Sequence, residues 1–244
     1  MTDFNPHRVI WTREKSARFW DQLTSTAGGD ENYFSAEMGD SIIRFARSHG
    51  ADLGGRVLDF GCGPGHLVRK LLAAGVNAEG ADFSPTSLER LGQFAAGASN
   101  FGGSHLIESI PTTLPGDAFS TVFFIETIEH LLDDDLRATI PELFRIVRPG
   151  GHVIVTTPND ENMGGLETVC PDCGCIFHSV QHVRSWNVAT ISDCMANAGF
   201  EAVAAKTWYL DQRWWRSRLI TAGARVLRKR LPHLIYIGTK RFAR

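Results

Sequence analysis

The sequence predicts an α/β protein with a doubly wound, mostly parallel sheet and helices on both faces of the sheet. Apolar segments of strand length alternate with amphipathic segments of helix length over most of the chain. A turn with three glycines, at 61–65, directly follows an apolar strand and precedes a helical stretch. At 244 residues, 43% hydrophobic and 21% charged, the chain is long enough to bury one substantial core.

Residues 1–50, which carry scattered aromatic side chains and a break at Gly28-Gly29, are expected to form an N-terminal helical cap before a main domain at 51–244. Segment 158–187 is too long for an ordinary connection and is rich in Gly, Asn, Cys and His, so it is expected to be a functional insertion. The predicted strands of the main domain are 56–60, 76–82, 103–108, 119–125, 151–157, 201–209 and 232–239, and its predicted helices are 65–74, 85–96, 134–147 and 188–198.

The glycine turn has the chemistry of a nucleotide site. A tight strand-to-helix turn needs positive φ and close backbone approach, and side chains at Gly61, Gly63 or Gly65 would obstruct a ligand lying across it. Asp59, just before the turn, can accept hydrogen bonds from that ligand, and Asp82 ends the next strand, where an acid can hold ribose hydroxyls. No Gly-Lys-Ser/Thr follows, which excludes a Walker loop, and the glycine spacing does not fit the dinucleotide pattern.

Together with the Pro149-Gly150-Gly151 turn before strand 151–157, these motifs resemble class I S-adenosylmethionine (SAM) methyltransferases of the type 11/12 group. The resemblance implies a Rossmann-like fold with a seven-stranded sheet, and SAM as the cofactor. The cofactor-binding residues that it implies are Asp59, Gly61, Gly63, Gly65, Asp82, Phe83, Glu108, Ser109 and Ile125. A doubly wound domain without a cofactor is the alternative.

A second group of polar residues, Glu126, Glu129 and His130, follows strand 119–125. Ligands of open α/β sheets bind beyond the carboxyl ends of the strands, and in a helical turn these three positions share one face. Two carboxylates and an imidazole can bind Mg, Mn, Fe or Zn. Alternatively the histidine acts as a general base or orients the substrate without a metal.

With the later Glu161, His178 and His182, this pattern resembles the metal-dependent enzymes that methylate the terminal 2′-hydroxyl of small RNAs. In that family a metal bound by the two glutamates, the histidine and one later histidine holds the ribose hydroxyls. The resemblance implies metal binding by Glu126, Glu129, His130 and either His178 or His182, and a catalytic role for Glu126, His130 and His182. The chain departs from the family's pattern at Gln181, where the family has Asp, and in the spacing of its later histidines.

Three cysteines lie in the insertion, and two of them, Cys170 and Cys173, form with the histidines the spacing C-x2-C-x4-H-x3-H, which is close to that of zinc knuckles. Three interpretations remain open. Both histidines bind a structural zinc with the cysteines, or the cysteines hold a zinc and leave a histidine for a catalytic metal, or the thiols are free. The residues concerned are Cys170, Cys173, Cys175, His178 and His182.

From Lys206 onward the chain has eleven Lys and Arg residues and a single acid, a net charge of +10. Segment 211–232 interleaves arginines with aromatic and aliphatic residues, as in basic amphipathic helices that contact membranes. It would also attract nucleic acid, or it packs on the domain. No run of eighteen apolar residues and no signal-peptide pattern is present, so we expect a cytoplasmic protein, with or without membrane association.

The leading functional prediction is metal-assisted O-methylation of a sugar or polyol hydroxyl in a glycan, lipid-linked or nucleotide acceptor. One alternative is metal-independent methylation of a quinone-like or natural-product small molecule. Another, of a different class, is a non-catalytic protein that binds SAM for regulation.

Overall fold

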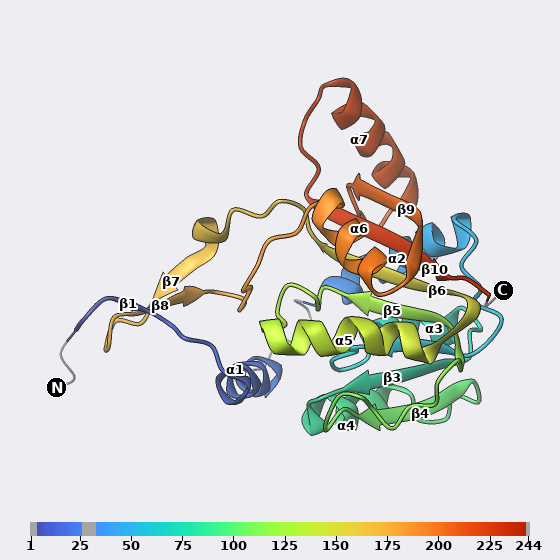
Figure 1. Cartoon of the computed structure of the whole chain (residues 1–244), viewed down its shortest axis with the longest axis horizontal. Coiled ribbons are helices and arrows are strands. Elements are labelled where there is room, and N and C mark those ends of the chain that lie inside the picture. The colour runs from blue at the N-terminus through green and yellow to red at the C-terminus, as the bar shows by residue number, and fades with distance from the viewer. Residues whose placement is uncertain (1–3, 26–32, 243–244) are drawn as a thin grey trace.

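The computed structural model describes residues 4–25 and 33–242, so the predicted break at Gly28-Gly29 lies outside the described residues. A seven-stranded sheet with the order β4-β3-β2-β5-β6-β10-β9 forms the body of the protein (Figure 1). β10 pairs antiparallel with both of its neighbours and the other pairs are parallel, which confirms a mainly parallel, doubly wound sheet. The strands are β2 (Val57–Phe60), β3 (Ala78–Asp82), β4 (Phe101–Leu106), β5 (Phe119–Ile125), β6 (Val147–Pro158), β9 (Phe200–Trp208) and β10 (His233–Lys240).

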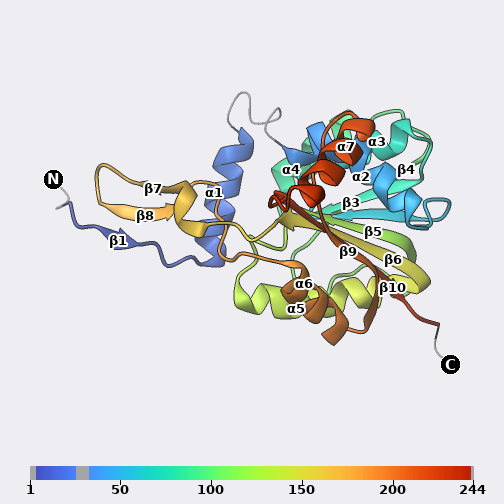
Figure 2. The same ribbon diagram turned by 90° about the horizontal axis from the view of Figure 1, so that it is seen from above.

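Helices cover both faces of this sheet (Figure 2). One face carries α5 (Asp133–Ile146) and α6 (Val188–Asn197), and the other carries α2 (Phe34–Ser48), α3 (His66–Ala73), α4 (Pro85–Phe94) and α7 (Trp214–Val226). A separate apolar core fills the space on each side of the sheet. Within residues 4–25 and 33–242, no helix is both long enough and apolar enough to cross a membrane.

Three predicted strands have wrong boundaries, and the first of them, β3, begins at Ala78 rather than 76. β6 begins at Val147 rather than 151, because Val147 already pairs with Phe119 and the Pro149-Gly150-Gly151 segment is accommodated by an irregularity in that ladder. β4 spans 101–106 rather than 103–108, because Phe101 already pairs with Ala78. Glu108 and Ser109 therefore lie beyond the carboxyl end of β4, at the edge of the sheet where ligands bind.

The N-terminus and the insertion together form a small second sheet that sequence reasoning missed. β1 (His7–Arg8) pairs parallel with β8 (Cys175–His178), which pairs antiparallel with β7 (Glu167–Val169) after the short 3-10 helix Met163–Leu166. This sheet and α1 (Arg13–Ser25) project together from the body (Figure 1). The predicted cap is thus divided: α2 packs on α3 of the body, whereas β1 joins the insertion.

His233, at the start of β10, predicts an acid-sensitive contact in the fold. Its Nδ1 accepts a hydrogen bond from the amide of Leu210 at 3.0 Å, and burial lowers the pKa of His233 to about 4. Because this value lies below the ordinary one, the unfolded chain takes up the proton first as the pH falls from 6.5 towards 4, and stability is lost over that window.

We expect His233 to account for up to about 2 kcal/mol of destabilisation between pH 7 and pH 5. His233→Asn, which keeps an acceptor near the Leu210 amide, should show a correspondingly smaller loss in urea unfolding. Equal pH dependence of the two proteins would contradict this assignment.

Candidate functional site

The glycine turn connects β2 to α3, and all three of its glycines have left-handed backbone, with φ of 79° at Gly61, 50° at Gly63 and 90° at Gly65. A Cβ at Gly65 would lie 2.4 Å from the Leu91 side chain, and one at Gly61 would lie 2.8 Å from that of Thr127. The sequence predicted that these two positions need glycine because a side chain would obstruct a ligand. In the structure, the side chains of Leu91 and Thr127 already leave no space for a Cβ. Only at Gly63 is the neighbour a residue of the N-terminal cap, Tyr33, at 3.2 Å.

Two buried carboxyl groups flank the turn. Asp82 accepts hydrogen bonds from the amides of Gly63 at 2.8 Å and Ser84 at 2.9 Å, so it fixes the turn in addition to facing the cofactor edge. Burial, and to a smaller extent the charge of Asp82, raise the pKa of Asp59 to about 8. Asp59 is therefore mostly protonated at neutral pH and can donate a hydrogen bond to a ligand as well as accept one.

The other residues predicted to bind the cofactor follow the carboxyl ends of neighbouring strands. Phe83 follows β3 and is about half exposed (48%), which leaves its ring available for stacking. Glu108 and Ser109 are exposed after β4, and Ile125 is buried at the end of β5. The predicted cofactor residues thus follow the carboxyl ends of four neighbouring strands, from β4 across β3 and β2 to β5.

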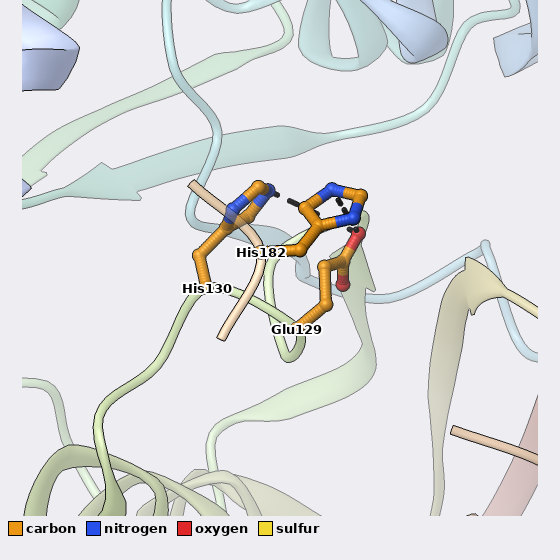
Figure 3. Close-up of side chains that lie close together, drawn as sticks. All are labelled: Glu129, His130 and His182. Carbon is orange, nitrogen blue, oxygen red and sulfur yellow. Dashed lines mark ion pairs between the residues drawn. The ribbon is translucent and has the colours of Figure 1, made fainter. Parts of the chain in front are cut away.

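The structure brings the acids and histidines of the second motif together with those of the insertion. Ligand atoms of Glu129, His130 and His182 lie within 4.8 Å of one another (Figure 3). Oε1 of Glu129 is 3.9 Å from Nε2 of His130 and 4.0 Å from Nε2 of His182. The ligand atoms of a second group, Glu161, His178 and His182, also lie within 4.8 Å of one another. The rings of His178 and His182 stack with centroids 4.5 Å apart.

Sequence reasoning assigned no role to Glu161, although it lies at the centre of the second group. Its carboxylate contacts Nδ1 of His182, and its Oε1 is 3.6 Å from Nε2 of His178. The sequence feature that could have indicated Glu161 is its position three residues after β6. Because β5 and β6 are adjacent, the residues that follow their carboxyl ends lie close together. Glu126, by contrast, belongs to neither group, although its Oε1 is buried without a hydrogen bond. We call Glu129, His130, Glu161, His178 and His182 the Glu/His cluster.

Backbone strain is concentrated around the Glu/His cluster. Of the five described residues other than glycine with positive φ, three border it: Glu126 at 47°, Asp160 at 50° and Gln181 at 58°. A left-handed residue with a side chain costs about 1–2 kcal/mol and persists only where its surroundings hold it, which is typical of functional sites. Asp160 and Gln181 directly precede Glu161 and His182, so the strained residues set the direction of these side chains.

The electrostatics of the cluster are unfavourable for the protein alone. Neither carboxylate oxygen of Glu129 accepts a hydrogen bond of normal geometry, and burial, followed by the charges of Glu126 and Glu161, raises its pKa well above the usual range. Burial also raises the pKa of Glu126 to about 7. Burial and the neighbouring His182 lower the pKa of His130 to about 3, which keeps its imidazole neutral. Neutral imidazoles beside carboxylates are the ligand set of a divalent cation.

Helix α1 connects this cluster with the cofactor edge. The indole of Trp20 lies edge-on against His130, with centroids 4.7 Å apart, and donates to Oε1 of Gln181 at 2.7 Å. The next residue, Asp21, accepts from the hydroxyl of Ser84 at 3.3 Å, beside Asp82. One turn of α1 therefore contacts both halves of the site.

The three cysteines of the insertion lie apart from the Glu/His cluster, around the turn between β7 and β8. Among the described residues, neither three-donor group includes a cysteine. The pKa of Cys170 is lowered, chiefly by the amides of Cys173 and Asp172. The histidines of the knuckle spacing thus turn toward Glu161 and Glu129, while a zinc on Cys170, Cys173 and Cys175 stays a prediction.

An open groove of about 330 Å³ lies beside Glu161, between the end of β6 and the start of β10. Its lining includes Asn162 and Arg230 together with three residues of those strand ends, Pro158, Asn159 and Pro232. The guanidinium of Arg230 donates to the carbonyl of Asn159 at 2.7 Å. The groove opens beside Glu161 of the Glu/His cluster.

Comparison with known proteins agrees with this architecture. A family described as a methyltransferase domain matches residues 30–205, which is more than two thirds of the chain. The chain belongs to this methyltransferase family. The predicted class I methyltransferase is confirmed at this level, as a SAM-dependent methyltransferase domain, whereas the likeness to metal-dependent RNA methyltransferases stays a prediction.

Individual relatives are more distant. Ubiquinone biosynthesis O-methyltransferases of Pseudomonas aeruginosa and Mesorhizobium japonicum are each 33% identical, over 43% and 64% of this chain and 45% and 53% of their own lengths. The chain thus spans about half the length of these curated relatives. A Burkholderia thailandensis 1,6-didemethyltoxoflavin-N1-methyltransferase, solved with its substrate and S-adenosylhomocysteine, has a TM-score of 0.65 at 14% identity and covers 98% of this chain and 94% of its own. That likeness shows the fold alone.

Proposed function

We propose that this protein transfers the methyl group of SAM to a hydroxyl oxygen of a small-molecule acceptor, at a site that also holds a divalent metal. The observation that carries the proposal is the Glu/His cluster, whose buried carboxylate, Glu129, accepts no hydrogen bond of normal geometry on either oxygen. Thr127 joins the cluster to the glycine turn, because it follows Glu126 and its side chain lies against Gly61. A methyl donor on the turn and an acceptor at the cluster would therefore be neighbours.

The chain's own residues supply binding and proton transfer. Either Glu129, His130 and His182 or Glu161, His178 and His182 would hold the metal, which when bound lowers the pKa of a coordinated hydroxyl and orients it. Glu126, with its pKa raised to about 7, can take a proton from the acceptor near neutral pH. Trp20 and Gln181 position His130, because the indole packs against its ring and the Gln181 amide donates to its carbonyl at 3.1 Å.

The named relatives support a small-molecule acceptor better than the sugar or polyol hydroxyl of the leading prediction. The sugar acceptor stays as the second candidate, because the cluster's ligand set suits an acceptor with two neighbouring hydroxyls. Metal-independent methylation fits the cluster less well, because it would leave the buried Glu129 carboxyl group without a partner for either oxygen.

Elemental analysis and a chelation series test the proposal. The purified protein should contain about one equivalent of a divalent metal that EDTA removes, and calorimetry should show Mn²⁺ rebinding to the stripped protein. S-adenosylhomocysteine release would be measured with a catechol, a ribonucleoside and methyl glucoside as probes. Turnover that EDTA leaves unchanged would contradict the metal role, and SAM binding without turnover on any probe would favour a regulatory protein.

A further inference from the structure

A surface helix usually buries its apolar side chains against the domain, but helix α7 buries small polar ones. Its buried residues are small and polar: Ser217, whose hydroxyl contacts the backbone of Asp211, and Thr221, which accepts from the amide of Tyr209 at 3.0 Å. Trp214 also faces inward and stacks on Trp208 with centroids 5.9 Å apart. The domain therefore holds α7 largely by hydroxyl groups and one indole, which leaves Leu219 and Val226 on the opposite side.

That opposite side is an apolar stripe exposed to solvent. Trp215, Leu219, Ala222 and Val226 follow one another at spacings of four, three and four residues, so they share one face of the helix. Trp215 is 57% exposed, Leu219 64% and Val226 83%. We call these four residues the α7 stripe. The helix stands at the margin of the molecule, away from the small N-terminal sheet (Figure 1).

Cations border the α7 stripe and continue past the end of the helix. No Asp or Glu occurs between Gln212 and Pro232, whereas this stretch contains seven Lys and Arg residues. Arg216 pairs loosely with Asp211 at 3.7 Å, and Arg225 lies over the ring of Trp208. Among the described residues, the structure gives no acidic partner to the remaining cations Arg213, Arg218, Arg228 and Lys229. An apolar stripe with unpaired cations at its margins matches the layered chemistry of a bilayer surface.

We propose that α7 and the loop to Arg230 dock on an anionic lipid bilayer, with the α7 stripe inserted at the level of the acyl chains and the cations on the headgroups. Each cation near an anionic surface adds about 1 kcal/mol, and the stripe adds the burial of Trp215, Leu219 and Val226. This surface is independent of the Glu/His cluster and of methyl transfer.

Two other occupants fit less well. A second copy of the chain would bring two arginine-bordered stripes face to face, and like charges would oppose that isologous contact. Nucleic acid phosphates would match the cations but would leave the α7 stripe in water. Only a lipid surface satisfies both the apolar and the charged parts.

The connection from α7 also leads to the open groove beside Glu161. Asn159 donates its amide to the carbonyl of Pro232 at 2.8 Å and its side chain to that of Leu231 at 2.9 Å. The loop after α7 is thus tied to a residue two positions before Glu161. Docking through α7 would bring this groove to the bilayer, the source of an acceptor with an apolar tail.

Vesicle flotation of the full chain tests the proposal. The protein should float with mixed phosphatidylcholine–phosphatidylglycerol vesicles, float weakly with phosphatidylcholine alone, and be released by added NaCl. Trp215→Ser combined with Leu219→Ser should weaken binding by about tenfold or more, and Arg218→Gln combined with Lys229→Gln should reduce its dependence on anionic lipid. The matched controls, Leu106→Ser on β4 and Arg18→Gln on α1, remove similarly exposed side chains and should bind as the unaltered protein does.

Circular dichroism and calorimetric SAM binding would establish that each variant is folded. Failure of the unaltered protein to float with anionic vesicles would overturn the proposal. So would a homodimer that dissociates when Trp215 and Leu219 are replaced while flotation is unchanged, or salt-sensitive binding of a model RNA without flotation.

Discussion

Replacing Glu129 by Gln is expected to lower methyl transfer by about a hundredfold or more while raising the stability of the metal-free protein. Both effects have one cause. The Glu129 carboxyl is 1% exposed, accepts no hydrogen bond of normal geometry and has a pKa raised by burial and by two neighbouring carboxylates. Without a cation the buried group must either take up a proton on folding or carry an unpaired charge, and both cost free energy, so the neutral amide should gain about 1–3 kcal/mol. With a cation, the loss of the charge removes a ligand.

Glu79 is the matched control, because it is a buried glutamate of the same sheet whose carboxylate is fully paired. It accepts two hydrogen bonds from Arg56, at 2.8 and 3.0 Å, and lies 2.8 Å from Nε2 of His105, and these partners lower its pKa. Glu79→Gln should therefore lose about 1–3 kcal/mol at neutral pH and keep its activity. Urea unfolding with EDTA and turnover with Mn²⁺ measure both effects. If Glu129→Gln is as destabilising as Glu79→Gln, Glu129 is a structural residue and not a metal ligand.

The sequence was sufficient for features that depend on local pattern. The seven strands, the alternation with helices and the glycine turn follow from hydrophobic periodicity and from residues such as Gly61 and Gly65, whose backbone φ few other residues tolerate. The boundary errors at β4 and β6 are of a different kind. They arise because pairing with Ala78 and Phe119 extends each strand past the end of its apolar run.

Features made by residues far apart in the chain could not be read in the same way. The pairing of β1 with β8 joins residues 7–8 to 175–176, and no periodicity in either segment encodes it. Glu161 meets His178 and His182 only because the insertion folds back over the end of β6, and it lies near Glu129 because β5 and β6 are neighbours. The sequence also does not predict which side of α7 faces the domain. Trp214 and Trp215 are neighbours of the same residue type, and only the stacking of Trp214 on Trp208 distinguishes them.

Alanine at Gly65 is expected to cause the largest loss of stability in the cofactor half of the site, about 2–4 kcal/mol. Gly65 is the N-terminal cap of α3 with φ of 90°, where a residue with a Cβ pays about 1–2 kcal/mol. Its Cβ would also approach a methyl carbon of Leu91 to 2.4 Å, and overpacking of this kind costs about 1–3 kcal/mol. Because the same turn forms the predicted cofactor site, SAM affinity should fall as well.

Two other glycines separate the causes of that loss. Gly75 has φ of 76° and no heavy atom within 4 Å of the place that a Cβ would occupy, so Gly75→Ala should show the cost of the backbone conformation alone. Gly92 lies inside α4 with equally open surroundings and no positive φ, so Gly92→Ala should gain about 0.5–1 kcal/mol from helix propensity. Thermal and urea unfolding should therefore show that Gly65→Ala and Gly75→Ala are less stable than the unaltered protein and that Gly92→Ala is more stable. If Gly65→Ala costs no more than Gly75→Ala, Leu91 moves aside, and glycine at position 65 serves the backbone conformation or the ligand rather than packing.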